Sequence, residues 1–257
     1  IARLLSARGH AVRSGSRRAP IPFDWDRPET WAPALDGVRA AYVSYFPDIA
    51  FPGAVEQVEA FAALARRMGL PRLVLLTGRG EQHAERAERI VRASGIPTAI
   101  VRAAWFAQNF SEGALLDAVQ AGVLPMPGGD VREPIVDVDD IAEVAVAALT
   151  EDGHDGEIYE VTGPRLMTFD EMADALSDAL GRPVRRLSLS FEAFHDAMAQ
   201  ANGEALAGIV TEIARETLDG RNARLADGVQ RALGRPPRDF ATYARDAART
   251  GAWSAAA

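Results

Sequence analysis

The stretch 71-PRLVLLTGRGEQHAERAERIVRASGIPTAIVRAAW-105 decides the fold. It contains two continuous apolar runs of the kind found in parallel strands that are covered on both faces. Between them, Ala84, Ala87 and Val91 recur at helical spacing, and Gly95 is placed to end that helix. The stretch therefore predicts a strand, a glycine-containing turn, a helix and a second strand.

The same alternation of strands and helices extends in both directions along the chain. Before this stretch we expect a helix over residues 1–8, a short strand in 11–18 and a strand followed by a helix over 38–69. After it, the alternation continues more loosely. There, Thr168 and Glu171 have the spacing of a helix capping box.

This pattern predicts an α/β fold. We expect a Rossmann-like, doubly wound parallel sheet with helices on both faces and right-handed crossovers. Residues 1–122 would form this dinucleotide-binding core. Residues 123–257 would form a smaller, mostly helical part that contributes to the sheet edge and to a substrate pocket.

Composition narrows the chemistry that the chain can perform. The sequence has no cysteine, and all 28 of its basic residues are arginine. Thiolate catalysis, disulfides and lysine Schiff bases are therefore excluded. The net charge of -8 argues against non-specific binding to nucleic acid. No apolar run reaches the roughly 18 residues of a membrane-spanning helix. We expect a cytoplasmic monomer or homodimer that acts on a small molecule.

The first residues of the sequence match a dinucleotide-binding domain from the middle of its first helix onward. Such a domain opens with a strand, a glycine-rich turn and a helix. Residues 1–8 fit the second half of that helix, and no G-x-G-x-x-G motif comes before them. We therefore expect roughly 15 residues, enough for one strand and its turn, to precede Ile1 in the whole protein.

Ser16, Arg17 and Arg18 lie where the second strand is expected to end. In dinucleotide-binding folds an acidic residue here binds the ribose of NAD(H), whereas an arginine accepts the 2′-phosphate of NADP(H). A guanidinium group can donate two parallel hydrogen bonds to phosphate oxygens. The triplet favours NADP(H) over NAD(H), and a solvated basic turn is the alternative interpretation.

Residues 73–113, LVLLTGRGEQHAERAERIVRASGIPTAIVRAAWFAQNFSEG, resemble the NmrA-like, atypical short-chain dehydrogenase/reductase family. Within that family the chain is similar to quinone reductases, triphenylmethane reductases and the ergot-alkaloid reductases that act on an iminium. The segments EPIVDVDDIAEVAVAAL, YEVTGPRLMTFDEMADAL and RPPRDFATYARDAARTGAW extend the resemblance nearly to the end of the chain. Members of the family include both reductases and regulators without activity.

The resemblance implies where a cofactor and a substrate would bind. Arg17 would face the 2′-phosphate, and the adenine would lie near Asp24 and Trp25. The remaining cofactor positions would be Ser44, Tyr45 and Phe46, then Thr77 and Gly78 beside the nicotinamide ribose, and Arg79. The residues that would border the nicotinamide and the substrate are Trp105, Phe106, Asn109 and Phe110.

The candidate catalytic residues are His83 and Tyr45. The family has a lysine or histidine on the helix after the glycine turn, and Ala84 stands at that position, with His83 one residue away. One residue corresponds to about 100° around a helix, so an exposed helix start is the alternative for His83. A tyrosine–lysine mechanism is excluded, because the sequence contains no lysine.

The histidines and carboxylates do not indicate a metal. No pair of histidines has the spacing of metal ligands, and the acids in 137–140 suit a helix N-terminus. We therefore expect no metal and assign the chemistry to a nicotinamide cofactor.

The sequence thus predicts an NADPH-dependent reductase of a small conjugated acceptor. Aromatic walls without a lysine suit a flat acceptor such as an imine or iminium, a quinone or an enone. Two alternatives remain open. One is a catalytically silent NADP(H)-binding sensor that docks a partner protein, and the other is a non-redox isomerase or cyclase.

Overall fold

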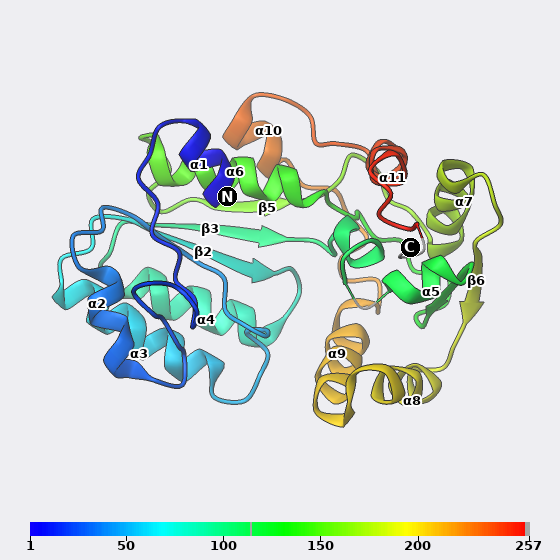
Figure 1. Cartoon of the computed structure of the whole chain (residues 1–257), viewed down its shortest axis with the longest axis horizontal. Coiled ribbons are helices and arrows are strands. Elements are labelled where there is room, and N and C mark those ends of the chain that lie inside the picture. Colours follow the sequence, from blue (N-terminus) through cyan, green and yellow to red (C-terminus); the bar gives the residue numbers. More distant parts are fainter. Residues whose placement is uncertain (114, 255–257) are drawn as a thin grey trace.

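The fold is centred on a parallel β-sheet. A computed structural model describes residues 1–113 and 115–254. Within these residues, parallel strands pair in the order β1 (Ala41–Val43), β2 (Leu73–Gly78), β3 (Thr98–Ala103) and β5 (Ile158–Val161). All four strands run in the same direction, so their carboxyl ends meet at one edge of the sheet (Figure 1).

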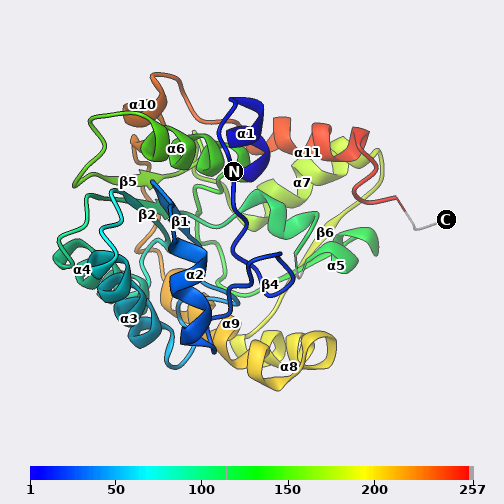
Figure 2. The same ribbon diagram turned by 60° about the vertical axis from the view of Figure 1, so that its left-hand side comes forward.

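Helices cover both faces of this sheet. The helices α3 (Ala54–Arg67) and α4 (Gln82–Ala93) lie on one face, and α1 (Ala2–Ala7), α6 (Val138–Thr150) and α10 (Gly228–Leu233) lie on the other (Figures 1 and 2). Leu73 and Leu75 pack with α3 and α4, whereas Val74 between them packs with α6. Successive side chains of β2 thus point into the hydrophobic cores on opposite faces of the sheet, which confirms the predicted α/β fold.

The helix predicted within residues 71–105 is present as α4. In α4, Ala84, Ala87 and Val91 are buried against the sheet. Gly95, which has a φ of 77°, follows the end of the helix. That left-handed conformation is accessible to glycine at little cost, and it lets the chain turn back into β3.

The second half of the chain is mainly helical. Its helices α6 and α10 cover the sheet, and most of its other elements lie beyond the carboxyl edge (Figure 1). The second half also contributes β5, which pairs with β3. In α7 (Phe169–Leu180), Thr168 and Glu171 form the predicted capping box. The remaining elements are η1 (Pro28–Thr30), α2 (Trp31–Leu35), η2 (Ala107–Phe110), α5 (Leu116–Gln120), β4 (Val123–Met126), β6 (Arg185–Ser188), α8 (Phe191–Asn202), α9 (Glu204–Thr217) and α11 (Phe240–Arg249).

One predicted element does not form. Residues 11–15 have no strand assignment, so the predicted strand before the basic triplet was wrong. A strand is stabilised by the hydrogen-bond ladder that it shares with a neighbour. In the described part of the chain, β1 pairs only with β2, and no ladder includes residues 11–15.

Neither a membrane span nor a metal cluster is found in 1–113 and 115–254. No helix there is long and apolar enough to cross a membrane. No three metal-ligating side chains converge there either.

Candidate functional site

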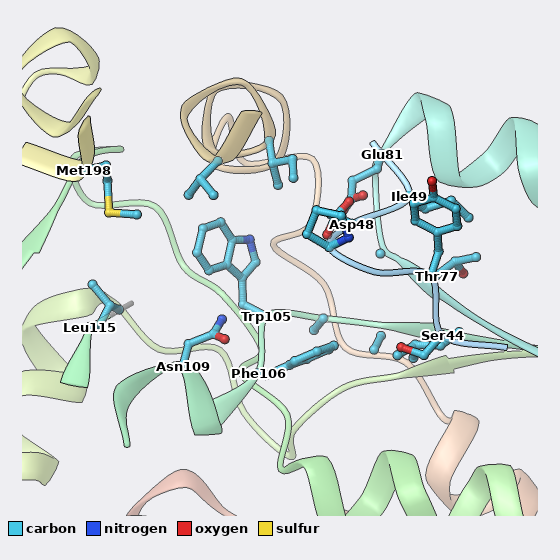
Figure 3. A pocket seen from close by; sticks show the side chains of 18 of the residues that line it. Ser44, Asp48, Ile49, Thr77, Glu81, Trp105, Phe106, Asn109, Leu115 and Met198 are labelled. Atoms are coloured by element: carbon cyan, nitrogen blue, oxygen red, sulfur yellow. The ribbon is translucent and has the colours of Figure 1, made fainter. Parts of the chain in front are cut away.

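A cavity of about 310 Å³ opens at the carboxyl edge of the sheet. The segments that follow β1, β2 and β3 form one side of it, and α8 and α9 form the other (Figure 3). Most of its surface is apolar. The lining includes Ser44, Tyr45, Asp48, Gly78, Glu81, Trp105, Phe106 and Asn109.

The segment after β1 contributes Ser44 and Tyr45 to the cavity. The ring of Tyr45 lies 4.8 Å from that of Trp25, measured between centroids, and its hydroxyl donates a 2.5 Å hydrogen bond to Oε1 of Gln57. Burial, together with the charge of Asp26, raises the pKa of Tyr45. The phenol therefore stays protonated at neutral pH and serves as a donor to Gln57.

The turn after β2, TGRGE, sends its side chains in different directions. The hydroxyl of Thr77 donates to Oε1 of Glu88 at 2.7 Å, under α4. Gly78 lies against the cavity. Gly80 takes a φ of 81°, and a Cβ there would lie 2.8 Å from Oδ1 of Asn222. The turn therefore needs a glycine at position 80 for its conformation and for the close approach of the C-terminal segment.

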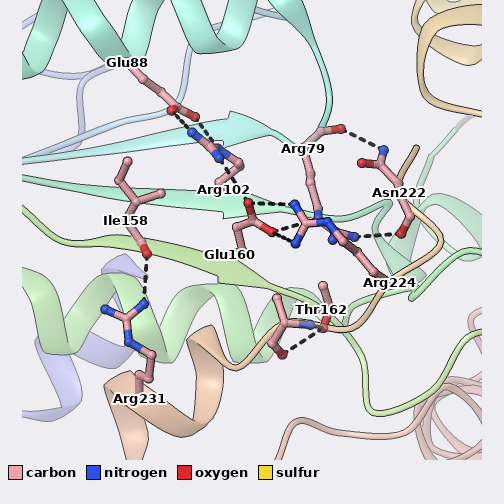
Figure 4. Close-up of polar contacts among 10 residues, drawn as sticks. Arg79, Glu88, Arg102, Ile158, Glu160, Thr162, Asn222, Arg224 and Arg231 are labelled. Atoms are coloured by element: carbon pink, nitrogen blue, oxygen red, sulfur yellow. Dashed lines mark hydrogen bonds and ion pairs between the residues drawn. The ribbon is translucent and has the colours of Figure 1, made fainter.

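Arg79 points out of this cavity, into a network of ion pairs (Figure 4). Its Nε donates to Glu160 at 3.1 Å, and its Nη1 donates to the carbonyl oxygen of Asn222 at 2.8 Å. Glu160 also pairs with Arg102 at 3.1 Å and with Arg224 at 2.9 Å. Arg79 thus ties β2, β5 and the C-terminal segment together, so its guanidinium group lies away from the cavity.

Glu81 places a buried carboxyl group in the cavity lining. Its Oε2 has no hydrogen-bond partner among the residues that are described. Burial raises the pKa of this carboxyl to about 8, and the charges of Asp48 and Glu216 act in the same direction. Sequence analysis did not single out Glu81 or Asp48. Their common signal is an acid shortly after the carboxyl end of a parallel strand, where such sheets bind ligands.

Trp105, Phe106 and Asn109 follow β3 and line the cavity, as Figure 3 shows. The indole Nε1 of Trp105 donates to Oγ1 of Thr217 at 3.1 Å, which orients the ring. This hydrogen bond also links the wall that follows β3 to the end of α9.

Comparison with known proteins assigns the family. A model of the NmrA-like family matches residues 83–238. The chain belongs to the NmrA-like family. It is 34% identical to an NAD(P)H azoreductase of Xenophilus azovorans, over 95% of this chain and 85% of that protein. The resemblance predicted from residues 73–113 is therefore confirmed.

Two solved structures show the same NmrA-like fold. A triphenylmethane reductase of Citrobacter sp. complexed with NADP(H) superimposes with a TM-score of 0.73 at 23% identity, covering 95% of this chain and 87% of that one. An NADPH-dependent quinone oxidoreductase of Escherichia coli complexed with NADPH gives 0.77 at 21% identity, covering 95% and 86%. At these identities the likeness is one of fold.

Ala84 stands at the helical position where the family has a lysine or histidine, and it faces the core. Ala84 is fully buried. His83 is exposed on the first turn of α4 and is not part of the cavity lining. The offset of one residue around the helix thus places the imidazole on the exposed side of α4, outside the cavity lining.

Of the other predicted residues, Phe46 and Phe110 lie outside the cavity lining. Phe110 is buried in the core, with its ring 5.2 Å from that of Phe240 in an edge-on contact. Phe46 is 69% exposed. Thr77 reaches the lining, but its hydroxyl is bound to Glu88.

The residues predicted at the adenine end of the NmrA-like site lie outside the cavity lining, and Trp25 adjoins that lining through its contact with Tyr45. Ser16, Arg17 and Arg18 are exposed, and within the described residues the two guanidinium groups make no hydrogen bond. Trp25 joins an aromatic cluster, and the carbonyl oxygen of Asp24 accepts a 2.7 Å hydrogen bond from Nε1 of Trp31. Packing and hydrogen bonding thus fix Asp24 and Trp25, whereas the side chains of Arg17 and Arg18 are exposed to solvent.

Proposed function

We propose that the protein is an NADPH-dependent reductase that transfers hydride to a small, flat, conjugated acceptor. The observation that carries the proposal is the apolar cavity at the carboxyl edge of a parallel sheet, walled by Trp105 and Phe106. Open α/β sheets bind their ligands at this edge. The similarity to an NAD(P)H azoreductase supports a conjugated acceptor.

Two features support a nicotinamide dinucleotide along this edge. The guanidinium groups of Arg17 and Arg18 are exposed and make no hydrogen bond to another described residue, so they are free to donate to phosphate oxygens. The cavity beside Ser44 and Gly78 has room for a flat ring. Arginine at this position favours the 2′-phosphate of NADPH.

The residues of the chain would bind and orient the two reactants. When bound, a reduced nicotinamide supplies the hydride. Trp105, held by Thr217, offers one flat surface for the acceptor, and Asn109 offers an amide for a hydrogen bond. The helices α8 and α9 line the side of the cavity opposite the strand ends with apolar side chains, which would limit the water around the reacting atoms.

Cofactor binding and turnover test this proposal together. Protein fluorescence would be followed during titration with NADPH and NADH, and NADPH oxidation would then be measured with quinones, azo compounds and cationic dyes. We expect tighter binding of NADPH and oxidation with at least one class of acceptor. Tight binding without oxidation by any acceptor would contradict a reductase and favour a cofactor sensor.

A further inference from the structure

Glu81 is a carboxyl group in the cavity that none of the roles described so far uses. It precedes α4, and its side chain bends back over the end of β2. A Cβ added to Gly78 would lie 1.7 Å from Oε1 of Glu81. Gly78 does not have a positive φ, so its backbone does not require glycine. Glycine is needed at position 78 because the carboxyl group of Glu81 occupies the space that a side chain there would fill.

Acidic groups face Glu81 from two other elements. Asp48 comes from the segment after β1 and lines the same cavity, and Figure 3 shows both carboxyl groups on the same side of it. Glu216 comes from α9, where its Oε1 accepts a 3.2 Å hydrogen bond from the backbone N–H of Gln82. Both charges oppose ionisation of Glu81, as does burial.

The nearby cations are engaged elsewhere. Arg79, two residues earlier in the turn, pairs with Glu160 at 3.1 Å. Arg221 pairs with Glu216 at 3.5 Å and with Asp219 at 2.9 Å. In the parts of the chain that are described, no salt bridge reaches Glu81, and its Oε2 has no partner. The carboxyl group is therefore kept in its neutral form, with a proton to donate.

We propose that Glu81 is the catalytic acid that donates a proton to neutral acceptors during their reduction. This inference rests on the proposed reductase function and assigns it a substrate class. It also accounts for a site without lysine, since a buried neutral carboxyl group performs the task of a cationic or phenolic acid. The group lies in the cavity wall and is therefore placed to touch the acceptor.

The proton completes the balance of the reaction. Hydride from a reduced nicotinamide dinucleotide adds to one nitrogen of an azo group, and the π electron pair moves to the second nitrogen. That nitrogen takes the proton as the O–H bond of Glu81 breaks, and the product is a hydrazine. A quinone becomes a hydroquinone in the same way. The nicotinamide is oxidised, and the carboxylate of Glu81 regains its proton from water.

Cationic acceptors need no such proton. Hydride addition to a triphenylmethane cation neutralises its charge and forms a C–H bond, so the reaction is balanced without an acid. Glu81 should therefore matter for neutral azo and quinone acceptors and have little effect on cationic dyes. A role in packing alone would affect both classes to the same extent.

The test compares Glu81→Gln with wild-type protein on a neutral azo compound and on a cationic triphenylmethane dye. The matched control is Glu85→Gln, the same substitution one turn later and outside the cavity lining. We expect Glu81→Gln to lower kcat on the azo compound by about 100-fold, as loss of a general acid does, and to change kcat on the dye by less than about threefold. Glu85→Gln should match wild type on both acceptors.

A second readout uses protein without cofactor. Infrared difference spectra against pH should show the carbonyl band of a protonated carboxyl group that disappears near pH 8. The band should be weaker in Glu81→Gln than in Glu85→Gln, and Glu133, a second buried carboxyl group whose pKa is raised to about 8, should contribute what remains in both variants. If Glu81→Gln does not fold, Glu81→Asp, which shortens the acid, should show the same selective loss to a smaller degree.

The outcomes separate this inference from the proposed function. If wild-type protein reduces both acceptors and Glu81→Gln slows both equally or neither, Glu81 is not the acid while the reductase function stands. If the band is unchanged in Glu81→Gln, the neutral carboxyl group is another residue and the inference is overturned. If wild-type protein reduces no acceptor, the reductase function fails and the catalytic role of Glu81 fails with it.

Discussion

Replacing Glu160 by glutamine should destabilise the fold through Arg79. The carboxylate of Glu160 receives ion pairs from Arg79, Arg102 and Arg224. Arg224 is 60% exposed, and Arg102 keeps a second partner in Glu88. The side chain of Arg79, however, is only 2% exposed, and its sole carboxylate partner in the described residues is Glu160.

The expected loss is about 3 kcal/mol, the lower end of the range for removing one partner of a buried ion pair, because glutamine can still accept one hydrogen bond. Urea denaturation at neutral pH measures the free energy of unfolding. The matched control is Glu157→Gln, which breaks the pair with Arg231. These two side chains are 36% and 42% exposed, so this pair should contribute about 0–1 kcal/mol. A loss below about 1 kcal/mol for Glu160→Gln would refute the reasoning.

The difference in the free energy of unfolding between wild type and Glu160→Gln should depend on pH. Burial alone would raise the pKa of Glu160, but the hydrogen bond from Arg224 and the charges of Arg79 and Arg224 hold it below its usual value. A lowered pKa stabilises the folded state above the pKa of the unfolded chain. That contribution is lost as the pH falls through the folded pKa. The difference between wild type and Glu160→Gln should therefore shrink as the pH falls below 4.5.

Three further predictions follow from the site. Arg17→Ala should weaken NADPH binding by about 1–3 kcal/mol and leave NADH nearly unchanged in fluorescence titrations, and equal losses would contradict the phosphate role. Because the folded pKa of Glu81 is raised to about 8, wild-type protein should lose more stability than Glu81→Gln as the pH rises from 4.5 toward 8, with Glu133 causing the loss that remains in the variant; equal losses in urea would argue against a buried neutral acid at position 81. Gly78→Ala should destabilise the fold by about 1–3 kcal/mol through crowding, and adding Glu81→Ala should relieve most of that loss; additive losses would place the clash elsewhere.

Local patterns were enough to predict most of the strands and helices of the core, although the strand expected in residues 11–18 does not form. The apolar runs in 71–105 and the spacing of Ala84, Ala87 and Val91 correctly predicted a covered strand–helix–strand unit. The capping box at Thr168 was predicted for the same reason. Such features depend on residues only a few positions apart, so they can be read without knowledge of the tertiary structure.

Features that depend on distant residues could not be predicted in this way. The turn at 77–80 was expected, but Arg79 binds Glu160 and Asn222, which lie far along the chain. Trp105 and Phe110 belong to one aromatic segment, and only the path of the chain after β3 separates the cavity wall from the core. Glu81 was missed because its burial results from the meeting of three elements.

Deuterium transfer tests the central claim most directly. Wild-type protein would be given a cationic triphenylmethane dye and NADPH labelled with deuterium at C4, on each face in turn. The account predicts that label from one face appears as a carbon–deuterium bond in the reduced dye, detected by mass spectrometry. Bound NADPH that is not oxidised, or dye reduced without label from either face, would contradict hydride transfer in this cavity.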